Sequence, residues 1–200
     1  VLELAETIDA PIGCSFMGIS GVPTEHPRFL GMQGMHGHYA SSVSMHHSDC
    51  IIALGVRFND RVTGDRSKFA SNARIVHIDV DGAELDKTVS AAAALRGDVK
   101  LTLKRLLPML KKTEHSEWAK IVDGYKKYEK EIADKRDGMT PVNVLNTLNG
   151  YLKPNTPVAT DVGQHQMWAA QVLKFSKIRR FISSGGLGTM GVGRGAAIGA

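Results

Sequence analysis

Cysteine, aromatic residues and long apolar runs are all scarce in this sequence of 200 residues. The only cysteines, Cys14 and Cys50, are too few for a disulfide framework and lack zinc-finger spacing, so we expect a reducing compartment. Aromatic residues make up 6% of the chain, but a hydrophobic content of 42% excludes a disordered protein. No apolar run reaches the roughly 18 residues that a membrane helix needs, so we expect no membrane span.

Charge is distributed unevenly along the chain. Residues 1–98 carry 8 Lys/Arg and 12 Asp/Glu, a net charge of −4, whereas residues 99–200 carry 17 and 8, a net charge of +9. A basic half can indicate a protein that binds nucleic acid. Here charges of both signs are interspersed between residues 100 and 136, as on the solvated face of a helix. We therefore expect no nucleic-acid partner.

Short apolar runs alternate with helical patterns from one end of the chain to the other. We expect buried strands at residues 12–17, 50–55, 74–80, 157–160 and 180–183. We expect helices at residues 2–8, 41–47, 82–89, 99–107, 140–151 and 164–173, and another after a glycine-rich turn near residue 190. Alternating strands and helices predict an α/β fold with parallel sheets and helices on both faces.

Residues 113–139 stand apart from these patterns. Thirteen of the 25 residues 113–137 are charged, and Trp118, Ile121, Tyr125, Tyr128 and Ile132 recur at steps of three and four. This spacing predicts an exposed amphipathic helix that connects two domains. We therefore expect a nearly complete central α/β domain at 1–112, a charged helical connector at 113–139 and the first part of a second α/β domain at 140–200. The chain opens and stops within helical patterns, so we expect further segments on both sides.

Clusters of glycine and polar residues follow several of the expected strands. They read GMHG at 34–37, GVRFNDR at 55–61, TDVGQHQ at 160–166 and GGLGTMGVG at 185–193. Ligands of open α/β sheets bind at the carboxyl ends of strands, where glycine admits a close backbone approach and helix N-termini bind anions. Arg57 and Arg61 favour an anion site. The last two clusters suggest one cofactor site, although a purely structural glycine turn stays open.

Histidine is the remaining candidate for a metal ligand. His36, His38, His46 and His47 lie close in sequence, but no carboxylate or thiolate accompanies them at regular spacing. We therefore expect no metal site within this chain.

The clusters, in this order, resemble the catalytic subunit of acetolactate synthase (acetohydroxyacid synthase), a thiamine-diphosphate enzyme family. The motifs that carry the resemblance are LGMQGMHG at 30–37, GVRFNDRVTG at 55–64, VHIDVD at 76–81, GDV at 97–99, TDVGQHQMWAAQ at 160–171 and SSGGLGTMG at 183–191. The resemblance covers nearly the whole chain. It implies a central FAD-binding domain followed by the start of a diphosphate-binding domain.

The resemblance also implies an activity. Pyruvate would be decarboxylated on thiamine diphosphate and condensed with pyruvate or 2-oxobutyrate, giving 2-acetolactate or 2-aceto-2-hydroxybutyrate for branched-chain amino acid biosynthesis. The implied cofactors are thiamine diphosphate, FAD and Mg²⁺, with the magnesium ligands outside this sequence. The implied assembly is a homodimer or homotetramer that allows a separate regulatory subunit, in the cytoplasm or, in a eukaryote, in plastids or mitochondria. The 200 residues alone are expected to be inactive.

Site residues follow from the same resemblance, position by position. At the reacting centre, Arg61 would receive the carboxylate of the second 2-oxo acid, Met35 would pack beside that acceptor, and Met190 would support the bent cofactor. The flavin, or the channel beside it, would be lined by Phe16, Met17, Gly34, Met35, His36, Gly55, Arg57 and Arg61, and its adenosine half by Asp79 and Asp98. Gln164 and His165 would lie near the diphosphate, and Gly188 would belong to the same supporting loop as Met190.

Departures from the family pattern, among them those at residues 59 and 13, and two alternative functions complete these expectations. Asn59 stands where the family usually has Asp, and Gly13 replaces a β-branched residue, which predicts a packing loss in that strand. Another thiamine-diphosphate 2-oxo-acid lyase or ligase, such as glyoxylate carboligase, is one alternative. A non-catalytic flavin-binding module is the other, and the intact clusters at 164–165 and 188–190 argue against it.

Overall fold

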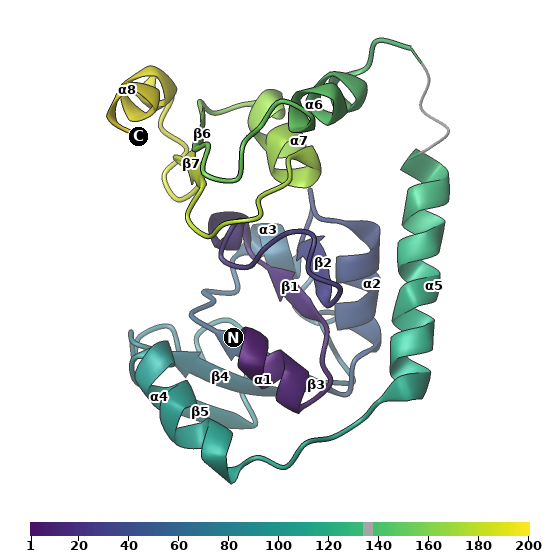
Figure 1. Ribbon diagram of the computed structural model, residues 1–200. Helices are drawn as coiled ribbons and strands as arrows, with labels where there is room; N and C mark the ends of the chain where they lie inside the picture. The colour runs from purple at the N-terminus through teal and green to yellow at the C-terminus, as the bar shows by residue number, and fades with distance from the viewer. Residues whose placement is uncertain (134–137) are drawn as a thin grey trace.

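The computed structural model describes residues 1–133 and 138–200, and its helices and strands alternate along most of the chain (Figure 1). The first part contains α1 (Leu2–Thr7), β1 (Ile12–Cys14), the 3-10 turn η1 (Phe16–Gly18), β2 (Phe29–Met32), α2 (Tyr39–His47), β3 (Cys50–Leu54), α3 (Asp60–Thr63), β4 (Arg74–Asp79), β5 (Ala93–Arg96), α4 (Val99–Leu106) and the 3-10 turn η2 (Leu107–Met109). After α5 (Ser116–Ala133) follow α6 (Pro141–Asn149), β6 (Val158–Thr160), α7 (Gln164–Val172), β7 (Phe181–Ser183) and α8 (Val192–Gly199).

Every strand pair in the described residues is parallel, as the alternation of strands and helices predicts. β1 pairs with β2, β3–β4–β5 form a three-stranded sheet, and β6 pairs with β7. In the first pair, Ile12 and Phe29 pack under α1, whereas Gly13 and Gly31 face α2. Helices therefore cover both faces of this pair, and the α/β fold class is confirmed.

One hydrophobic cluster joins the first part of the chain to the second. Ile19 and Met32, near β1 and β2, are buried against Ala169, Leu173 and Phe175, in and just after α7. In Figure 1, α7 lies above β1 and β2, where the upper and lower parts of the molecule meet. Because buried apolar contact is the main favourable term in folding, the two parts are packed onto each other rather than merely linked.

The predicted connector is a helix, but it packs along the side of α2 (Figure 1). Glu129 of α5 accepts hydrogen bonds from the backbone N–H groups of Tyr39 and Ala40, at 2.8 and 3.3 Å. The carboxylate thereby caps the N-terminus of α2 and complements its dipole. Val122 is the buried residue of α5. Residues 134–137 of the predicted connector lie outside the described residues.

Several sequence-based expectations differ from the structure. The helix expected at 82–89 is wrong, because Asp81 accepts a hydrogen bond from Ala83 N–H and Asp86, at φ +57°, accepts one from Ala91 N–H, which fold the segment into turns. The strand expected at 12–17 ends at Cys14, and the one at 50–55 is only partly buried. β2 and β5 were not predicted.

The packing loss expected at Gly13 stays a prediction. A Cβ at this position would overlap the amide nitrogen at the end of the Gln33 side chain and lie 2.9 Å from Ser41 Oγ, so a larger residue there would require these side chains to shift. Separately, no helix in the described part of the chain is long and apolar enough to cross a membrane.

Candidate functional site

The carboxyl ends of β3, β4 and β5 bring together Gly55, Asp79 and Asp98. Gly55 N–H donates to the Ile78 carbonyl at 2.9 Å, and Gly97 N–H donates to the Asp79 carbonyl at 2.8 Å, so the three strand ends lie side by side. The Asp79 side chain is buried, and its Oδ1 accepts the Asp81 N–H at 2.9 Å. Beside Gly55, where φ is +63°, a Cβ would meet nothing within 4 Å. This edge combines open space with a buried acceptor.

Asp98 has a structural task at the same edge. Its Oδ1 accepts the Leu101 N–H at 2.9 Å and caps α4. A side-chain cap of this kind satisfies one of the free N–H groups at a helix start. Only the hydrogen-bond acceptor sites that the helix cap leaves unused on the Asp98 carboxylate are available to a ligand.

Gly34, Met35 and Arg61 meet at the start of α3. Met35 N–H donates to the Arg61 carbonyl at 2.8 Å, and Gly34, with φ +101°, packs directly against that carbonyl. The Arg61 side chain is 69% exposed, and its guanidinium Nη1 lies 3.4 Å from Asp60 Oδ2. Asn59 caps α3 through the Val62 N–H at 3.2 Å. The backbone of Arg61 is therefore fixed, while its charged group faces solvent.

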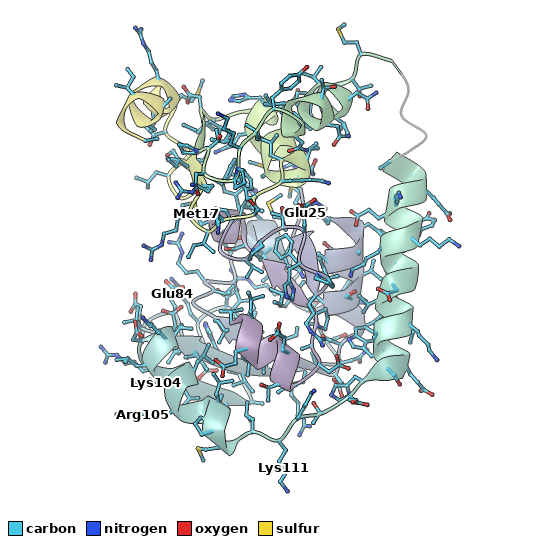
Figure 2. All side chains as sticks on the ribbon, in the orientation of Figure 1. Met17, Glu25, Glu84, Lys104, Arg105 and Lys111 are labelled. Atoms are coloured by element: carbon cyan, nitrogen blue, oxygen red, sulfur yellow. The ribbon has the colours of Figure 1, made fainter. Side chains whose placement is uncertain are left out.

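Phe16 and Met17 touch the glycine-rich turn of the second part. A Cβ on Gly185 would overlap the Phe16 ring and lie 2.6 Å from Met17 Sδ, so a larger residue there would require these two side chains to shift. Phe16 also packs edge-on against Phe181, with ring centroids 5.6 Å apart. Figure 2 shows Met17 at this seam between the two parts. Residues expected at the flavin thus contact the turn expected at thiamine diphosphate.

The N-terminus of α7 presents Gln164 and His165. Its N-cap is Gly163, and no hydrogen bond from the backbone N–H of Gln164 or His165 is found within the described residues. Gln166, one position further, donates to Ser183 Oγ at 2.6 Å, and that hydroxyl also lies 2.8 Å from Thr160 Oγ1. This network holds the helix start against the ends of β6 and β7.

The N-terminus of α8 is different, because Asp161 already occupies it. Both carboxylate oxygens of Asp161 lie 2.9 Å from the Gly191 nitrogen. The pKa of Asp161 is lowered by hydrogen bonds from the Val162 and Gly191 N–H groups, with a smaller contribution from Gly193 N–H. The glycine-rich turn therefore binds a carboxylate of its own chain, so of the two helix starts α7 is the one open to an external anion.

The remaining predicted site residues lie on the surface. Met190 is 79% exposed, and Gly188 forms part of the turn, with its N–H bonded to the Ser184 carbonyl. The side chains of His36 and Arg57 are exposed. Within residues 1–133 and 138–200, no hydrogen bond or ring contact joins Met190 to Met35 or Arg61.

Other reactive groups do not add to this site. Burial raises the pKa of the Cys14 thiol to about 12, which keeps it protonated and unreactive. The described residues contain no group of three or more His, Cys, Asp or Glu side chains that could hold a metal ion. A cavity of about 210 Å³ between α2 and the segment after α3, near His46 and Lys68, is lined by none of the predicted site residues.

Comparison with known protein families assigns both parts of the chain. Residues 1–106 match the family described as "Thiamine pyrophosphate enzyme, central domain", and residues 161–200 match "Thiamine pyrophosphate enzyme, C-terminal TPP binding domain". The chain belongs to the thiamine pyrophosphate enzyme family. The first match contains every residue expected at the flavin, and the second contains Gln164, His165, Gly188 and Met190.

Curated relatives from bacteria and an archaeon align over almost the whole chain. It is 42% identical over 200 residues to the acetolactate synthase large subunit of Buchnera aphidicola subsp. Schizaphis graminum, covering 98% of the chain and 35% of that protein. It is 40% identical to the large subunit of Escherichia coli acetolactate synthase isozyme 3, covering 98% and 36%. It is 43% identical to a probable large subunit from Methanocaldococcus jannaschii, covering 100% and 36%. The chain thus spans about a third of the length of these relatives.

The structure also identifies residues that sequence analysis missed. Asp161 was quoted only within a motif, and its position at the start of α8 depends on a contact 30 residues away. His38 was considered only as a metal ligand, but it hydrogen-bonds Gln171, 133 residues away. Ser20 Oγ accepts the N–H groups of Arg180 and Phe181. Neither spacing nor composition signals such contacts.

Proposed function

We propose that this chain is the part of an acetolactate synthase that holds the flavin and begins the thiamine-diphosphate site. The observation that carries the proposal is the pairing of Met35 with Arg61, which fixes the backbone of an arginine while its guanidinium stays exposed. The names of the relatives, and an alignment that covers nearly all of the chain, support it. The reaction is the condensation of decarboxylated pyruvate with pyruvate or 2-oxobutyrate.

In this proposal, Arg61 binds the carboxylate of the acceptor 2-oxo acid. Its contact with Asp60, at 3.4 Å between largely exposed groups, is too weak to hold the guanidinium against a substrate carboxylate. A guanidinium binds a carboxylate through two parallel hydrogen bonds, which orients as well as attracts it. Met35, 66% exposed beside Arg61, supplies an apolar wall for the rest of the acceptor.

Thiamine diphosphate fits the start of α7. The backbone N–H groups of Gln164 and His165 make no hydrogen bond within the described residues, and such groups at a helix start favour an anion. The network of Gln166, Ser183 and Thr160 keeps that helix in place. When bound, thiamine diphosphate supplies the electron sink for loss of carbon dioxide from a 2-oxo acid. Met190 is proposed to support its bent conformation by filling a gap with an unbranched apolar side chain.

FAD fits the edge formed by β3, β4 and β5. Asp79 supplies a buried carboxylate at a strand end, the usual acceptor for the hydroxyl groups of a ribose. Gly55 leaves space for close approach. We propose that this edge binds the adenosine half, that the residues around Met35 bind the remainder, and that FAD is structural, with no net redox role in turnover.

The rest of the enzyme is also a proposal. By resemblance, the Mg²⁺ ligands lie outside these 200 residues, the subunits form a homodimer or homotetramer, and the enzyme is cytoplasmic. Because relatives are named large subunits, a separate small regulatory subunit is proposed as a partner. The domain division at residues 112 and 140 is retained as a proposal.

Product analysis with the complete subunit tests the function. Supplied with pyruvate, thiamine diphosphate, Mg²⁺ and FAD, it is expected to form 2-acetolactate, and with added 2-oxobutyrate also 2-aceto-2-hydroxybutyrate. Preferential formation of tartronate semialdehyde from glyoxylate would instead favour the carboligase alternative. Binding of flavin without turnover of any 2-oxo acid would favour the non-catalytic module.

A further inference from the structure

The His38 side chain connects the first part of the chain to the second. Its Nδ1 accepts the Met32 N–H at 3.0 Å, and its Nε2 lies 2.9 Å from the Gln171 carbonyl. Since Nδ1 acts as an acceptor, the ring proton is on Nε2, which donates to Gln171. The ring fits because residue 31 is glycine with φ +90°, where any Cβ would overlap it. Both ring nitrogens are therefore used, and the ring orientation is fixed.

Gln171 returns a second hydrogen bond across the same seam. Its side-chain Nε2 donates to the His36 carbonyl at 2.6 Å. Gln171 thus holds the loop from residue 36 to 38 through both its backbone and its side chain. Its carbonyl is one of the last four of α7, which have no partner inside a helix, so His38 also caps that helix end.

These contacts lie at one end of α7, and the proposed diphosphate site lies at the other. α7 runs from Gln164 to Val172, so about 10 Å of helix separates Gln164 from Gln171. His36 and the adjacent Met35 belong to the loop proposed to line the flavin. A single short helix therefore joins the two proposed cofactor sites.

We propose that His38 and Gln171 form a clasp that couples flavin binding to thiamine-diphosphate binding; this inference rests on the proposed function. A flavin that orders the loop at 35–38 also fixes Gln171, and with it the α7 amides of Gln164 and His165. Thiamine diphosphate then binds a helix whose position is already set, so its affinity is higher. If thiamine diphosphate binds first, the affinity for the flavin rises by the same factor. Neither clasp residue is placed against a cofactor, so both are positioning residues.

Other contacts across the seam reach different segments and provide a control. Thr24 Oγ1 accepts the Phe175 N–H at 2.8 Å, beyond the end of α7. This bond is of the same kind as those of the clasp, but it does not involve the loop at 35–38. Thr24→Val keeps the shape of the side chain and removes one hydrogen bond across the seam.

The test measures cofactor affinities in the complete subunit. Calorimetric titration of the cofactor-free protein with thiamine diphosphate and Mg²⁺, with and without FAD, is expected to show about tenfold tighter binding when FAD is present, since each hydrogen bond contributes a factor of roughly 2 to 10. FAD must gain the same factor from thiamine diphosphate. In His38→Asn, the shorter side chain can still accept the Met32 N–H but does not reach Gln171. His38→Asn and Gln171→Leu each remove one of the two bonds of the clasp, so we expect the factor to fall to about threefold in each and to stay near tenfold in Thr24→Val.

The outcomes separate this inference from the proposed function. If the parent protein binds both cofactors with a coupling factor near one, or if His38→Asn and Gln171→Leu retain the parent factor, the clasp does not couple the sites. An equal loss in Thr24→Val would also overturn the inference, because any weakening of the seam would then have the same effect. If the parent binds neither cofactor, the proposed function itself is wrong, and the clasp inference fails with it.

Discussion

Replacing Gly34 with alanine should displace Arg61 without altering the arginine side chain. Gly34 has φ +101°, and a Cβ there would lie 3.0 Å from Val62 Cα and still closer to the Arg61 carbonyl oxygen. Both atoms belong to the backbone of α3, so neither can move away by rotating a side chain. α3 must retreat, and the hydrogen bond from Met35 N–H to the Arg61 carbonyl, now 2.8 Å long, must lengthen or break.

The destabilisation expected in Gly34→Ala has two contributions, backbone strain and steric overlap. A non-glycine residue in the left-handed region costs roughly 1–2 kcal/mol. Inserting a methyl group into packed backbone adds about 1–3 kcal/mol. We therefore expect Gly34→Ala to lower the free energy of unfolding by about 2–5 kcal/mol. A retreat of Arg61 by roughly 1 Å should reduce the rate of acceptor capture about 100-fold.

Gly64→Ala is the matched control. Gly64 also has a positive φ, +56°, but a Cβ there would meet nothing within 4 Å. Because its ψ of −124° lies outside the left-handed helical region, Gly64→Ala should lose about 1–3 kcal/mol through backbone strain alone and keep acceptor capture within a few fold of the parent. Urea unfolding and acceptor competition in the complete subunit measure both effects. If the two variants had equal stability and equal acceptor capture, the inferred contact between Gly34 and α3 would be wrong.

Three further predictions concern single side chains. Arg61→Ala should weaken acceptor capture by roughly 10- to 150-fold while decarboxylation of the first pyruvate persists, and unchanged acceptor saturation would refute the carboxylate role. Met190→Leu conserves the side-chain volume and should lower the free energy of unfolding by under about 1.5 kcal/mol. Met190→Ala should slow exchange of the thiazolium proton about 100-fold at saturating cofactor. If Met190→Ala exchanged that proton as fast as the parent, Met190 would be an ordinary packing residue. The pKa of Asp161 is lowered from its usual value of 3.8. Its hydrogen bonds to the start of α8 should therefore be fully present above pH 3.8 and be lost only as the pH falls through the lowered pKa. The amide NMR signal of Gly191 should report this titration and lose it in Asp161→Asn; a midpoint at or above 3.8 in the parent would contradict the bonds described.

Sequence patterns predicted elements whose signals are local. Asp98 and Thr140 directly precede α4 and α6, and both side chains accept a hydrogen bond from the helix start, as capping residues do. β4 was predicted from its apolar, β-branched run. In contrast, β5 has four exposed residues and neither β-branched residues nor an apolar–polar alternation, and β2 contains Gly31 in a conformation foreign to strands. The segment 82–89 has helix-forming residues, but Asp81 and Asp86 bond to nearby backbone instead.

In the candidate site, too, the sequence predicted the local features and not the contacts between distant residues. Motifs indicated which residues belong to it, and the structure brings Met35 to Arg61 and Phe16 to the turn at Gly185. The sequence could not show that Asp161 occupies the start of α8. This contact depends on how far β6 lies from the glycine-rich turn, and only the folded backbone sets that distance.

The most direct test of the account is a count of cofactors in the purified complete subunit. If β3–β5 hold a flavin and α7 holds a diphosphate, flavin absorbance and a thiochrome assay should find FAD and thiamine diphosphate in equal amounts. Asp79→Asn should lower the affinity for FAD more than the affinity for FMN, because FMN lacks the adenosine half that Asp79 is proposed to bind. Protein that retains thiamine diphosphate and turns over pyruvate with no flavin bound would contradict the assignment of the central domain.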